Sequence, residues 1–418
     1  MAQKQKAILA GANFNNKHHF SDSMKELFYL ADACDIEVVG AITQKLQRED
    51  TVYYMGKGKI QEVLSLLDQN DAAMVIFNDE LSPSQIRNLE AVLQCRIIDR
   101  TVLILDIFAQ RAKTREAKLQ VEIAKLQYML PRLIGLRASL SRQGGGAGLR
   151  NRGFGETKLE LDRRKILDKI SRLHRELEKL VVQRQSQRKK REKTQIPVVA
   201  LVGYTNSGKS TIMNAMIDLY HSSDDKQVFV KDMLFATLET SVRHIKFPDN
   251  KSFLLTDTVG FISKLPHQLI KAFRSTLEEV TEADMMIHVV DYSNPNYEQQ
   301  IEVTKATLKE LGADNIPIIY AYNKIDLVDG EILDIERDCV YISAKNKAGI
   351  YQLTNAIRQK IFTHYINCEL LIPYDKGNIV SYLKDNANIK SAAYNSDGIL
   401  ISMECREADY KRYQGYVN

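Results

Sequence analysis

The octapeptide from Gly203 to Ser210 constrains the fold more than any other part of this chain. It reads GYTNSGKS, which is two glycines separated by four residues and followed by Lys and Ser. An apolar run of strand length, residues 198–202, precedes it, and apolar residues at helical spacing follow it. A strand, glycine loop and helix in this order point backbone N–H groups and the positive end of a helix at phosphate oxygens. The sequence therefore predicts a phosphate-binding loop in an α/β domain.

Each part of the loop has an expected role. Lys209 would reach the β- and γ-phosphates, and the Ser210 hydroxyl would hold Mg²⁺. We expect nucleotide contacts along the whole segment, from Gly203, Tyr204, Thr205, Asn206, Ser207, Gly208, Lys209, Ser210 and Thr211.

Three later segments, each at the end of an apolar run, indicate which nucleotide binds. Residues 257–260 read DTVG, so Asp257 would approach Mg²⁺ through water and the Gly260 N–H would contact the γ-phosphate. Residues 323–326 read NKID, and the Asp326 carboxylate could accept hydrogen bonds from N1–H and the 2-amino group of guanine, a donor pair that adenine lacks. Residues 343–345, Ser-Ala-Lys, would meet the guanine carbonyl through their backbone. We therefore predict a GTP-binding domain whose base contacts come from Asn323, Lys324, Asp326, Ser343, Ala344 and Lys345.

The catalytic details are less complete. Thr237, in the segment 232–238, is the candidate for a further Mg²⁺ ligand, with Thr240 and Thr211 as alternatives. The predicted catalytic set is Lys209, Thr237 and Gly260. Many small GTPases place Gln directly after D-x-x-G to orient the attacking water, but this chain has Phe261 there, which cannot hold a water. Asn206 either binds K⁺ beside the phosphates or only stabilises the turn of the loop.

Composition limits the remaining possibilities. A chain of 418 residues is too long for one core, and no apolar run approaches the 18 or so residues of a membrane span. The first residues lack the apolar stretch of a secretory signal. The five cysteines form no C-x-x-C pair, so we expect scattered buried thiols in a reducing cytoplasm.

Positive charge gathers in the middle of the chain. Residues 111–193 hold 24 lysines and arginines against 9 aspartates and glutamates, a net charge of +15, which leaves −10 for the rest of a chain whose net charge is +5. The positive charge could simply belong to a solvent-exposed helix face. Its concentration in one segment instead favours binding to a polyanionic partner. Two apolar seams run through the segment, and they are formed by Leu119, Ile123, Leu126 and Leu130, and by Leu159, Ile166, Ile170, Leu173, Leu177 and Leu180.

The seams predict two helices, one from about Arg111 to Pro131 and one from Thr157 to about Lys193, packed as an antiparallel hairpin. The connection between them, residues 137–155, holds six glycines and four arginines and cannot bury a core. It is either a flexible linker or, as we favour, a loop that contacts RNA, because glycine allows close backbone approach and arginine pairs with phosphate and stacks on bases.

The two ends of the chain read as small α/β units. Residues 6–98 alternate strand and helix patterns, which predicts a parallel sheet covered by helices. The basic turn from Tyr54 to Lys59 is either a second phosphate site or a loop that touches RNA. After Tyr365 we expect a strand at 368–372, a helix at 377–385 and a hairpin across residues 395–398, together forming a docking module.

The predicted fold class is thus α/β, with a P-loop GTPase domain preceded by a small parallel α/β domain and a long helical-hairpin arm, and followed by a small C-terminal α+β domain. The expected boundaries are 1–108 for the N-terminal domain, 109–195 for the arm, 196–364 for the GTP-binding domain and 365–418 for the C-terminal domain.

Taken together, these features resemble the HflX family of translation-factor-like GTPases over nearly the whole chain. The resemblance rests on the segments 54–59, 98–101, 111–115, 144–146, 155–158, 203–211, 235–238, 257–261 and 323–326. The family also lacks the catalytic Gln, so Phe261 fits it.

The resemblance implies a cytoplasmic, monomeric GTPase, loosely associated with membranes at most, that binds the large ribosomal subunit and its rRNA. It implies GTP as substrate, Mg²⁺ as cofactor and the splitting or rescue of stalled or idle ribosomes under stress. Two alternatives stay open. One is an RNA-binding or ribosome-assembly protein for which nucleotide only tunes affinity, and the other is a GTPase that assists RNA modification.

Overall fold

The computed structural model of the chain describes residues 4–15, 19–143, 151–192, 196–220, 234–235, 241–264, 266, 280–328 and 338–417. Side chains are described throughout these ranges except in 133–143, 151–159 and 184–192. By its contacts the chain divides into two units. The first comprises residues 1–188, 231–239 and 261–276, and the second comprises residues 189–230, 240–260 and 277–418.

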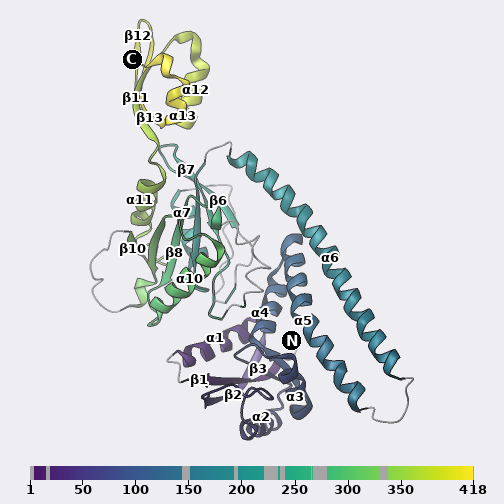
Figure 1. Ribbon diagram of the computed structural model, residues 1–418. Coiled ribbons are helices and arrows are strands. Elements are labelled where there is room, and N and C mark those ends of the chain that lie inside the picture. The colour runs from purple at the N-terminus through teal and green to yellow at the C-terminus, as the bar shows by residue number, and fades with distance from the viewer. Residues whose placement is uncertain are drawn as a thin grey trace. The chain divides into compact units, whose positions relative to one another are not determined.

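The first unit begins with a four-stranded parallel sheet (Figure 1). Its strand order is β2-β1-β3-β4, from β1 (Gln5–Phe14), β2 (Ile36–Leu46), β3 (Met74–Phe77) and β4 (Arg96–Asp99). The helices between the strands are α1 (Phe20–Ala33), α2 (Lys57–Asn70) and α3 (Pro83–Leu93). These elements confirm the alternating strands and helices predicted for residues 6–98, and the parallel sheet that they were expected to form.

Local sequence explains why these elements form where they do. Every residue of β3 is buried, as expected for a strand covered on both faces. Helix α3 begins at a reciprocal cap, in which the Ser82 side chain accepts from the Gln85 N–H (3.3 Å) and the Gln85 side chain accepts from the Ser82 N–H (2.8 Å). Pro83 then occupies the first helical turn, where its missing N–H costs nothing.

A helix that the sequence analysis missed follows this sheet. Helix α4 (Arg100–Arg111) is capped by Asp99, whose carboxylate accepts from the Val102 N–H at 2.9 Å. Most of its apolar side chains are buried, including Phe108. The first arm helix therefore begins at Arg115 rather than near Arg111.

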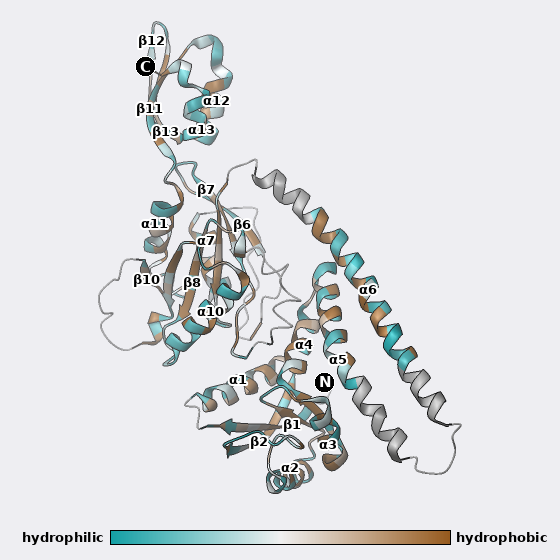
Figure 2. Cartoon of the chain, viewed as in Figure 1, coloured by the Kyte–Doolittle hydropathy of each residue, from teal (hydrophilic) through white to brown (hydrophobic). Residues whose placement is uncertain are grey.

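The arm consists of two long helices, α5 (Arg115–Gln143) and α6 (Asn151–Glu192). Both predicted seams bury apolar side chains, and the arm's small core holds Leu119, Ile123 and Leu173 with Leu126, Leu177 and Leu180 packed around it. Arg115 pairs with Glu176, while Glu122, further along α5, pairs with the earlier residue Lys169 at 2.6 Å. The helices are therefore antiparallel, as predicted, and Figure 2 shows apolar and polar bands alternating along them.

The prediction that the first arm helix ends at Pro131 is wrong, because α5 continues to Gln143 with the proline inside it. A proline within a helix removes one backbone hydrogen bond and disfavours the turn. Tertiary contacts just beyond it offset this cost. The Arg132 guanidinium lies 2.6 Å from the Asp99 carboxylate and 3.6 Å above the Tyr128 ring, and the Tyr128 hydroxyl donates to Asp99 at 2.6 Å.

The predicted glycine–arginine connection is also shorter than expected. Residues 137–143 belong to α5 and residues 151–155 belong to α6, so helix extends into both ends of the segment that we interpreted as a loop. Only residues 144–150 separate the two helices, and these lie outside the described residues. Helix propagation from a long, well-packed arm can carry single glycines such as Gly153 and Gly155, each at a cost of about 1 kcal/mol.

The second unit contains a six-stranded sheet in the order β10-β9-β8-β5-β7-β6. Its strands are β5 (Val198–Gly203), β6 (Ser241–Lys246), β7 (Ser252–Asp257), β8 (Met285–Asp291), β9 (Ile318–Asn323) and β10 (Cys339–Tyr341). All neighbours pair in parallel except β6, which pairs antiparallel with β7. The described helices of this domain are α7 (Lys209–Tyr220), α10 (Tyr297–Leu311) and α11 (Ile350–Ile361).

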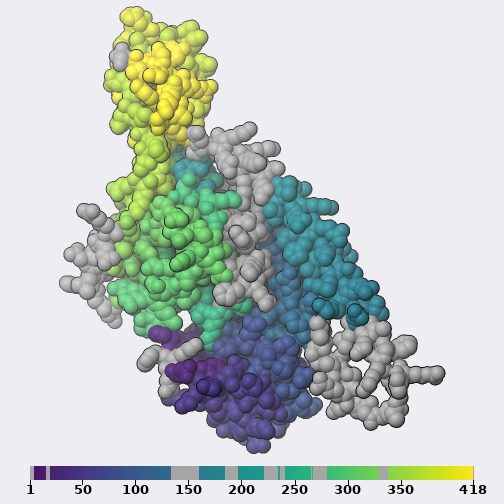
Figure 3. All heavy atoms as spheres, in the orientation of Figure 1, coloured from purple at the N-terminus to yellow at the C-terminus, as the bar shows by residue number. Residues whose placement is uncertain are grey.

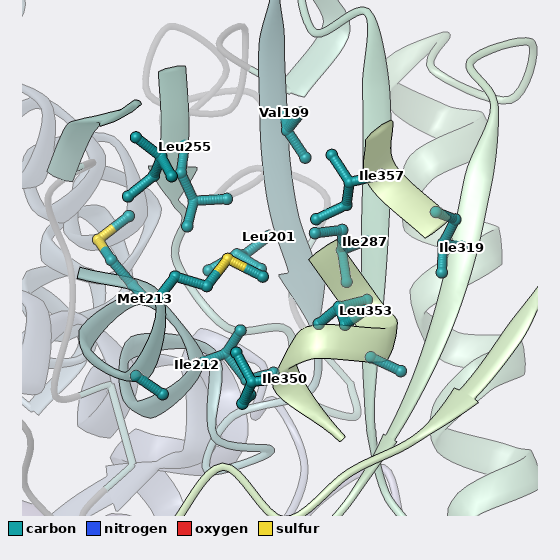
Figure 4. Packing of buried hydrophobic residues seen from close by; sticks show 14 of the residues in the cluster. Val199, Leu201, Ile212, Met213, Leu255, Ile287, Ile319, Ile350, Leu353 and Ile357 are labelled. Atoms are coloured by element: carbon teal, nitrogen blue, oxygen red, sulfur yellow. The ribbon is translucent and has the colours of Figure 1, made fainter. Parts of the chain in front are cut away.

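The core of this sheet positions the carboxyl ends of its strands. Apolar side chains of β5, β7, β8 and β9 meet those of α7 and α11, as Figure 4 shows for Leu201, Ile287 and Leu353. Figure 2 shows strands such as β8 as mostly hydrophobic. Because β5, β7, β8, β9 and β10 are all parallel, their carboxyl ends share one edge, where the predicted motifs lie.

One buried group in this core predicts a pH-dependent stability. His288 of β8 is 1% exposed, and within the described part of the chain its Nδ1 has no hydrogen-bond partner. Burial, with the positive charges of Lys305 and Lys209, lowers its pKa from 6.5 to about 3. Between these values the unfolded chain binds a proton that the folded chain does not, so stability should fall as pH drops below about 6.5, by up to roughly 1.4 kcal/mol per pH unit.

Chemical unfolding at pH 7.5, 6 and 5 measures this effect. We expect His288→Phe, which cannot titrate, to lose much of the acid-dependent decrease, whereas the same change at His244, which is exposed in β6, should keep it. Equal pH slopes for wild type and His288→Phe would contradict the assignment.

The C-terminal residues form a three-stranded antiparallel sheet in the order β11-β13-β12. Its elements are β11 (Tyr365–Ile372), α12 (Gly377–Asn386), β12 (Asn388–Asn395), β13 (Gly398–Arg406) and α13 (Glu407–Arg412). The predicted strand, helix and hairpin are confirmed, and Figure 3 shows these residues in yellow as a lobe. The β6–β7 turn is bonded to it, because the Asn250 side chain donates to the carbonyls of Lys384 (2.8 Å) and Ala387 (3.0 Å) at the end of α12.

The prediction of buried, scattered cysteines is wrong for most of them. Cys34, Cys95, Cys339 and Cys368 are only half-buried, since the first three lie at the ends of elements that reach the surface. Cys405 is buried, with its Sγ 3.6 Å from that of Cys368. Among the described helices, none combines the length and the apolar character that a membrane span requires.

Candidate nucleotide-binding site

The phosphate loop connects β5 to α7 in the second unit, as predicted. Its last glycine, Gly208, has φ +98°, and a Cβ there would lie 2.1 Å from Asn323 Nδ2. Glycine is therefore required both by the backbone conformation and by the close approach of the base-binding strand. Asn206 has φ +60°, a left-handed conformation that asparagine tolerates well, which accounts for it as a turn residue. Whether it also binds K⁺ stays a prediction.

Lys209 lies inside the loop. It is 6% exposed, and its Nζ donates to the carbonyls of Gly203 (3.1 Å) and Tyr204 (2.8 Å). Burial lowers its pKa to about 8, and the nearby Asp257 carboxylate opposes that shift. The loop thus encloses an amine at the amino end of a helix, which is the electrostatic arrangement that phosphate oxygens need.

The two expected Mg²⁺ ligands lie together although they are far apart in the sequence. The Ser210 Oγ donates to the Asp257 carboxylate at 2.6 Å. Next to them, the buried Thr258 hydroxyl donates to the Leu201 carbonyl at 2.6 Å and fixes the end of β7 against β5. A hydroxyl and a carboxylate are hard oxygen ligands, and Mg²⁺ is commonly held by one or two protein oxygens plus phosphates, so these residues fit that ion. Thr237, the third candidate, lies outside the described residues.

Gly260 closes the side of the loop where the γ-phosphate would lie. A Cβ at this position would lie 2.7 Å from Thr205 Cα and 2.9 Å from Lys209 Nζ. The backbone of the D-x-x-G segment can therefore approach the phosphate loop only because residue 260 is glycine. Phe261, the next residue, is 2% exposed.

The predicted base-binding residues also meet at one edge. The Asn323 side chain donates to the Ser207 carbonyl (2.8 Å) and accepts from the Ala344 N–H (2.9 Å), so it joins the phosphate loop to the segment after β10. The Ser343 hydroxyl donates to Asp326 Oδ1 at 2.6 Å and orients that carboxylate. Asp326 lies in a short 3-10 helix, Ile325–Leu327.

The remaining predicted residues lie around the phosphate loop and the base-binding edge. The Lys324 amine pairs with Asp291 at 2.7 Å. Tyr204 and Thr211 are half-buried, Ser207 is buried and Lys345 is exposed. Of the predicted site residues that the structure describes, all lie on the phosphate loop, on the D-x-x-G segment or on the two segments beside the base.

The segment that follows D-x-x-G has partners that the sequence did not predict. By its contacts Ser263 belongs to the first unit, where its hydroxyl donates to Glu26 of α1 and accepts from the Arg100 guanidinium at 3.1 Å. Lys264 pairs with Asp79 at 2.5 Å. Arg100, 2% exposed, also pairs with Glu26. No local sequence pattern predicts these contacts, because Ser263 and Lys264 lie more than 150 positions from their partners in the sequence.

Three family models match successive parts of this chain. Residues 21–109 match the family described as GTP-binding GTPase N-terminal, residues 111–191 match the GTP-binding GTPase middle region, and residues 198–324 match the 50S ribosome-binding GTPase family. In solved structures, a GTP-binding protein from Sulfolobus solfataricus in complex with GDP is similar at 23% identity and a TM-score of 0.45, over 86% of this chain and 99% of that one.

Two relatives are similar to this chain over nearly its whole length. GTPase HflX of Caldanaerobacter subterraneus subsp. tengcongensis is 45% identical over 414 residues, covering 99% of this chain and 94% of that protein. GTPase HflX of Escherichia coli is 37% identical over 408 residues, covering 96% of this chain and 93% of that protein. Similarity at this level, over nearly the full length, shows that the chain belongs to the HflX family of GTPases, enzymes that hydrolyse GTP.

Proposed function

We propose that this GTPase binds the large ribosomal subunit through its basic arm and uses GTP binding and hydrolysis to split or rescue stalled or idle ribosomes under stress. One observation carries the proposal: a guanine-nucleotide site shares the chain with a two-helix arm segment of net charge +15. The match of residues 198–324 to ribosome-binding GTPases supports it. Because its partner would be the ribosome, the protein would act in the cytoplasm.

Two ions would take part in this function. Ser210 and, through water, Asp257 would hold Mg²⁺, which neutralises charge on the β- and γ-phosphate oxygens when bound. K⁺ beside Asn206 would supply further positive charge between the phosphates. The protein's own contribution is the buried amine of Lys209 and the backbone N–H groups around it.

The arm is suited to phosphate contact along its outer faces. Arg163 and Arg164 of α6 are exposed, and both lie outside the seam between the two helices. Arginines held on a rigid helix offer fixed donors to phosphate, and release of the counterions that they displace makes such binding sensitive to salt.

The test is GTP turnover by the purified protein with and without large ribosomal subunits, in K⁺ and in Na⁺ buffer. We expect strong stimulation by the subunits, and a lower rate in Na⁺ if Asn206 holds K⁺. Arg163→Glu with Arg164→Glu should weaken subunit binding and reduce the slope of log affinity against log salt by about 1 for each arginine lost. The matched control changes two exposed lysines of α10, Lys305 and Lys309, to Glu.

A second candidate function is an RNA-binding protein whose affinity is tuned by nucleotide. Phe261 favours it, since the usual water-orienting residue is absent. Tight subunit binding without stimulated turnover would support this candidate. Stimulation that survives the arm double variant would contradict the arm as the ribosome-binding element.

A further inference from the structure

Phe261 stands where many GTPases have a water-orienting Gln, and within the described part of the site a buried hydroxyl has no hydrogen-bond partner. The Thr205 side chain is 7% exposed, and its Oγ1 forms no hydrogen bond with any described residue. Buried polar groups are almost always hydrogen-bonded, and an orphaned one costs stability. An unpaired hydroxyl within a phosphate loop indicates that its hydrogen-bond partner is present only when the nucleotide is bound.

The position of Thr205 limits which group can bond to its hydroxyl. A Cβ on Gly260 would lie 2.8 Å from Thr205 Cγ2 and 2.9 Å from Lys209 Nζ, so the three residues surround one point. Lys209 and the Gly260 N–H are the groups expected on the γ-phosphate. The Thr205 side chain therefore lies on the γ-phosphate side of the loop, where the attacking water must also lie.

A second orphaned hydroxyl in the same loop is placed differently. Ser207 is fully buried and its Oγ also lacks a described partner. It lies 3.3 Å from the Cβ position of Gly203, at the end of β5 and beneath the loop. Of the two residues, only Thr205 is among the nearest neighbours of the Gly260 Cβ position, through its Cα and its methyl group.

We propose that the Thr205 hydroxyl positions the attacking water during GTP hydrolysis, in place of the glutamine that Phe261 does not supply. The water oxygen forms a bond to the γ-phosphorus while the bond from that phosphorus to the bridging oxygen breaks, and its electron pair leaves with GDP. The proton of the water passes to the released phosphate. The threonine hydroxyl is hydrogen-bonded throughout and is not consumed.

Two substitutions separate the hydroxyl from the rest of the side chain. Thr205→Val keeps the shape and the methyl contact with Gly260 but removes the hydroxyl, whereas Thr205→Ser keeps the hydroxyl. In single-turnover hydrolysis at saturating GTP, without ribosomes, we expect Thr205→Val to lower the rate roughly 100-fold, the usual loss when one positioned donor is removed. Thr205→Ser should stay within about threefold of wild type, and both variants should bind GTP and GDP within about threefold of wild type.

Thermal stability of the nucleotide-free protein provides an independent readout. Removing an unpaired buried hydroxyl should raise the melting temperature of Thr205→Val by a few degrees while its rate falls. Thr304→Val is the matched control, because Thr304 of α10 is fully buried, has an Oγ1 without a described partner and lies outside the site. It should raise the melting temperature and leave the hydrolysis rate unchanged.

Several results would overturn the proposal. Wild-type hydrolysis by Thr205→Val excludes the hydroxyl from the reaction. An equal loss of rate in Thr205→Val and Thr205→Ser assigns the effect to packing. Weaker GTP binding with an unchanged saturated rate makes Thr205 a binding residue only. Since no ribosomes are present, failure of the proposed ribosomal function leaves these measurements unaffected.

Discussion

Replacing Lys209 by alanine is expected to abolish GTP binding at physiological nucleotide concentrations. Lys209 is 6% exposed and its amine donates to the Gly203 and Tyr204 carbonyls, so it would meet the phosphates in a site that excludes most water. Losing one partner of a buried, hydrogen-bonded charge pair costs about 4 kcal/mol, which is roughly a thousandfold in affinity. Equilibrium titration with a fluorescent GTP analogue in Mg²⁺ buffer measures this loss.

The same substitution should make the nucleotide-free protein more stable. Burial lowers the pKa of Lys209 to about 8, which means that the folded protein disfavours its charged form. Alanine removes the free-energy cost of burying the charged amine. If Lys209→Ala has a higher melting temperature and no longer binds GTP, the lysine serves nucleotide binding and lowers the stability of the nucleotide-free protein.

A matched control is available in the same unit. Lys251 is also buried, at 8% exposed, and its amine donates to Glu404 at 2.8 Å, away from the phosphate loop. Lys251→Ala should lower the melting temperature and leave GTP affinity within about threefold, since it breaks an ion pair outside the site. Retained tight GTP binding by Lys209→Ala would show that the loop does not hold the phosphates as described.

Most of the nucleotide site could be predicted because each motif combines a local pattern with a rule of sheet geometry. The segments around Ser210, Asp257, Asn323 and Ser343 each follow an apolar strand. Parallel strands place their carboxyl ends at one edge, so the order of the motifs already implied that they meet. The 2.6 Å contact between Ser210 and Asp257 is the result of that rule.

What could not be predicted depends on contacts between distant residues. The local chemistry of Pro131 predicts a helix end, whereas the helix continues past it, where Arg132 pairs with the distant Asp99. Helix α4 was missed because an apolar run next to a strand can belong to either kind of element. The contacts of Ser263 with Glu26 and Arg100 have no pattern of their own, since each of the three is an ordinary polar residue in its local sequence.

Asp326→Asn should change which base the protein binds. The Ser343 hydroxyl fixes Asp326 Oδ1 at 2.6 Å, so the carboxylate is oriented before the nucleotide arrives. Guanine donates from N1–H and its 2-amino group to that carboxylate, and an amide in its place presents an NH₂ group that faces one of these donors. Charge-assisted hydrogen bonds are lost and donors are left unpaired, which should weaken GTP binding by roughly 100-fold or more.

Xanthosine triphosphate tests whether the loss concerns the base. Xanthine has a carbonyl where guanine has its 2-amino group, so the amide of Asp326→Asn can donate to it while the wild-type carboxylate repels it. We therefore expect the variant to prefer xanthosine triphosphate over GTP, and Asp314→Asn, a change at an exposed aspartate after α10, to keep the preference for guanine. Equal weakening for both nucleotides would indicate damage to the edge formed by Asp326 and Ser343, whereas unchanged guanine selectivity would remove Asp326 from base recognition altogether.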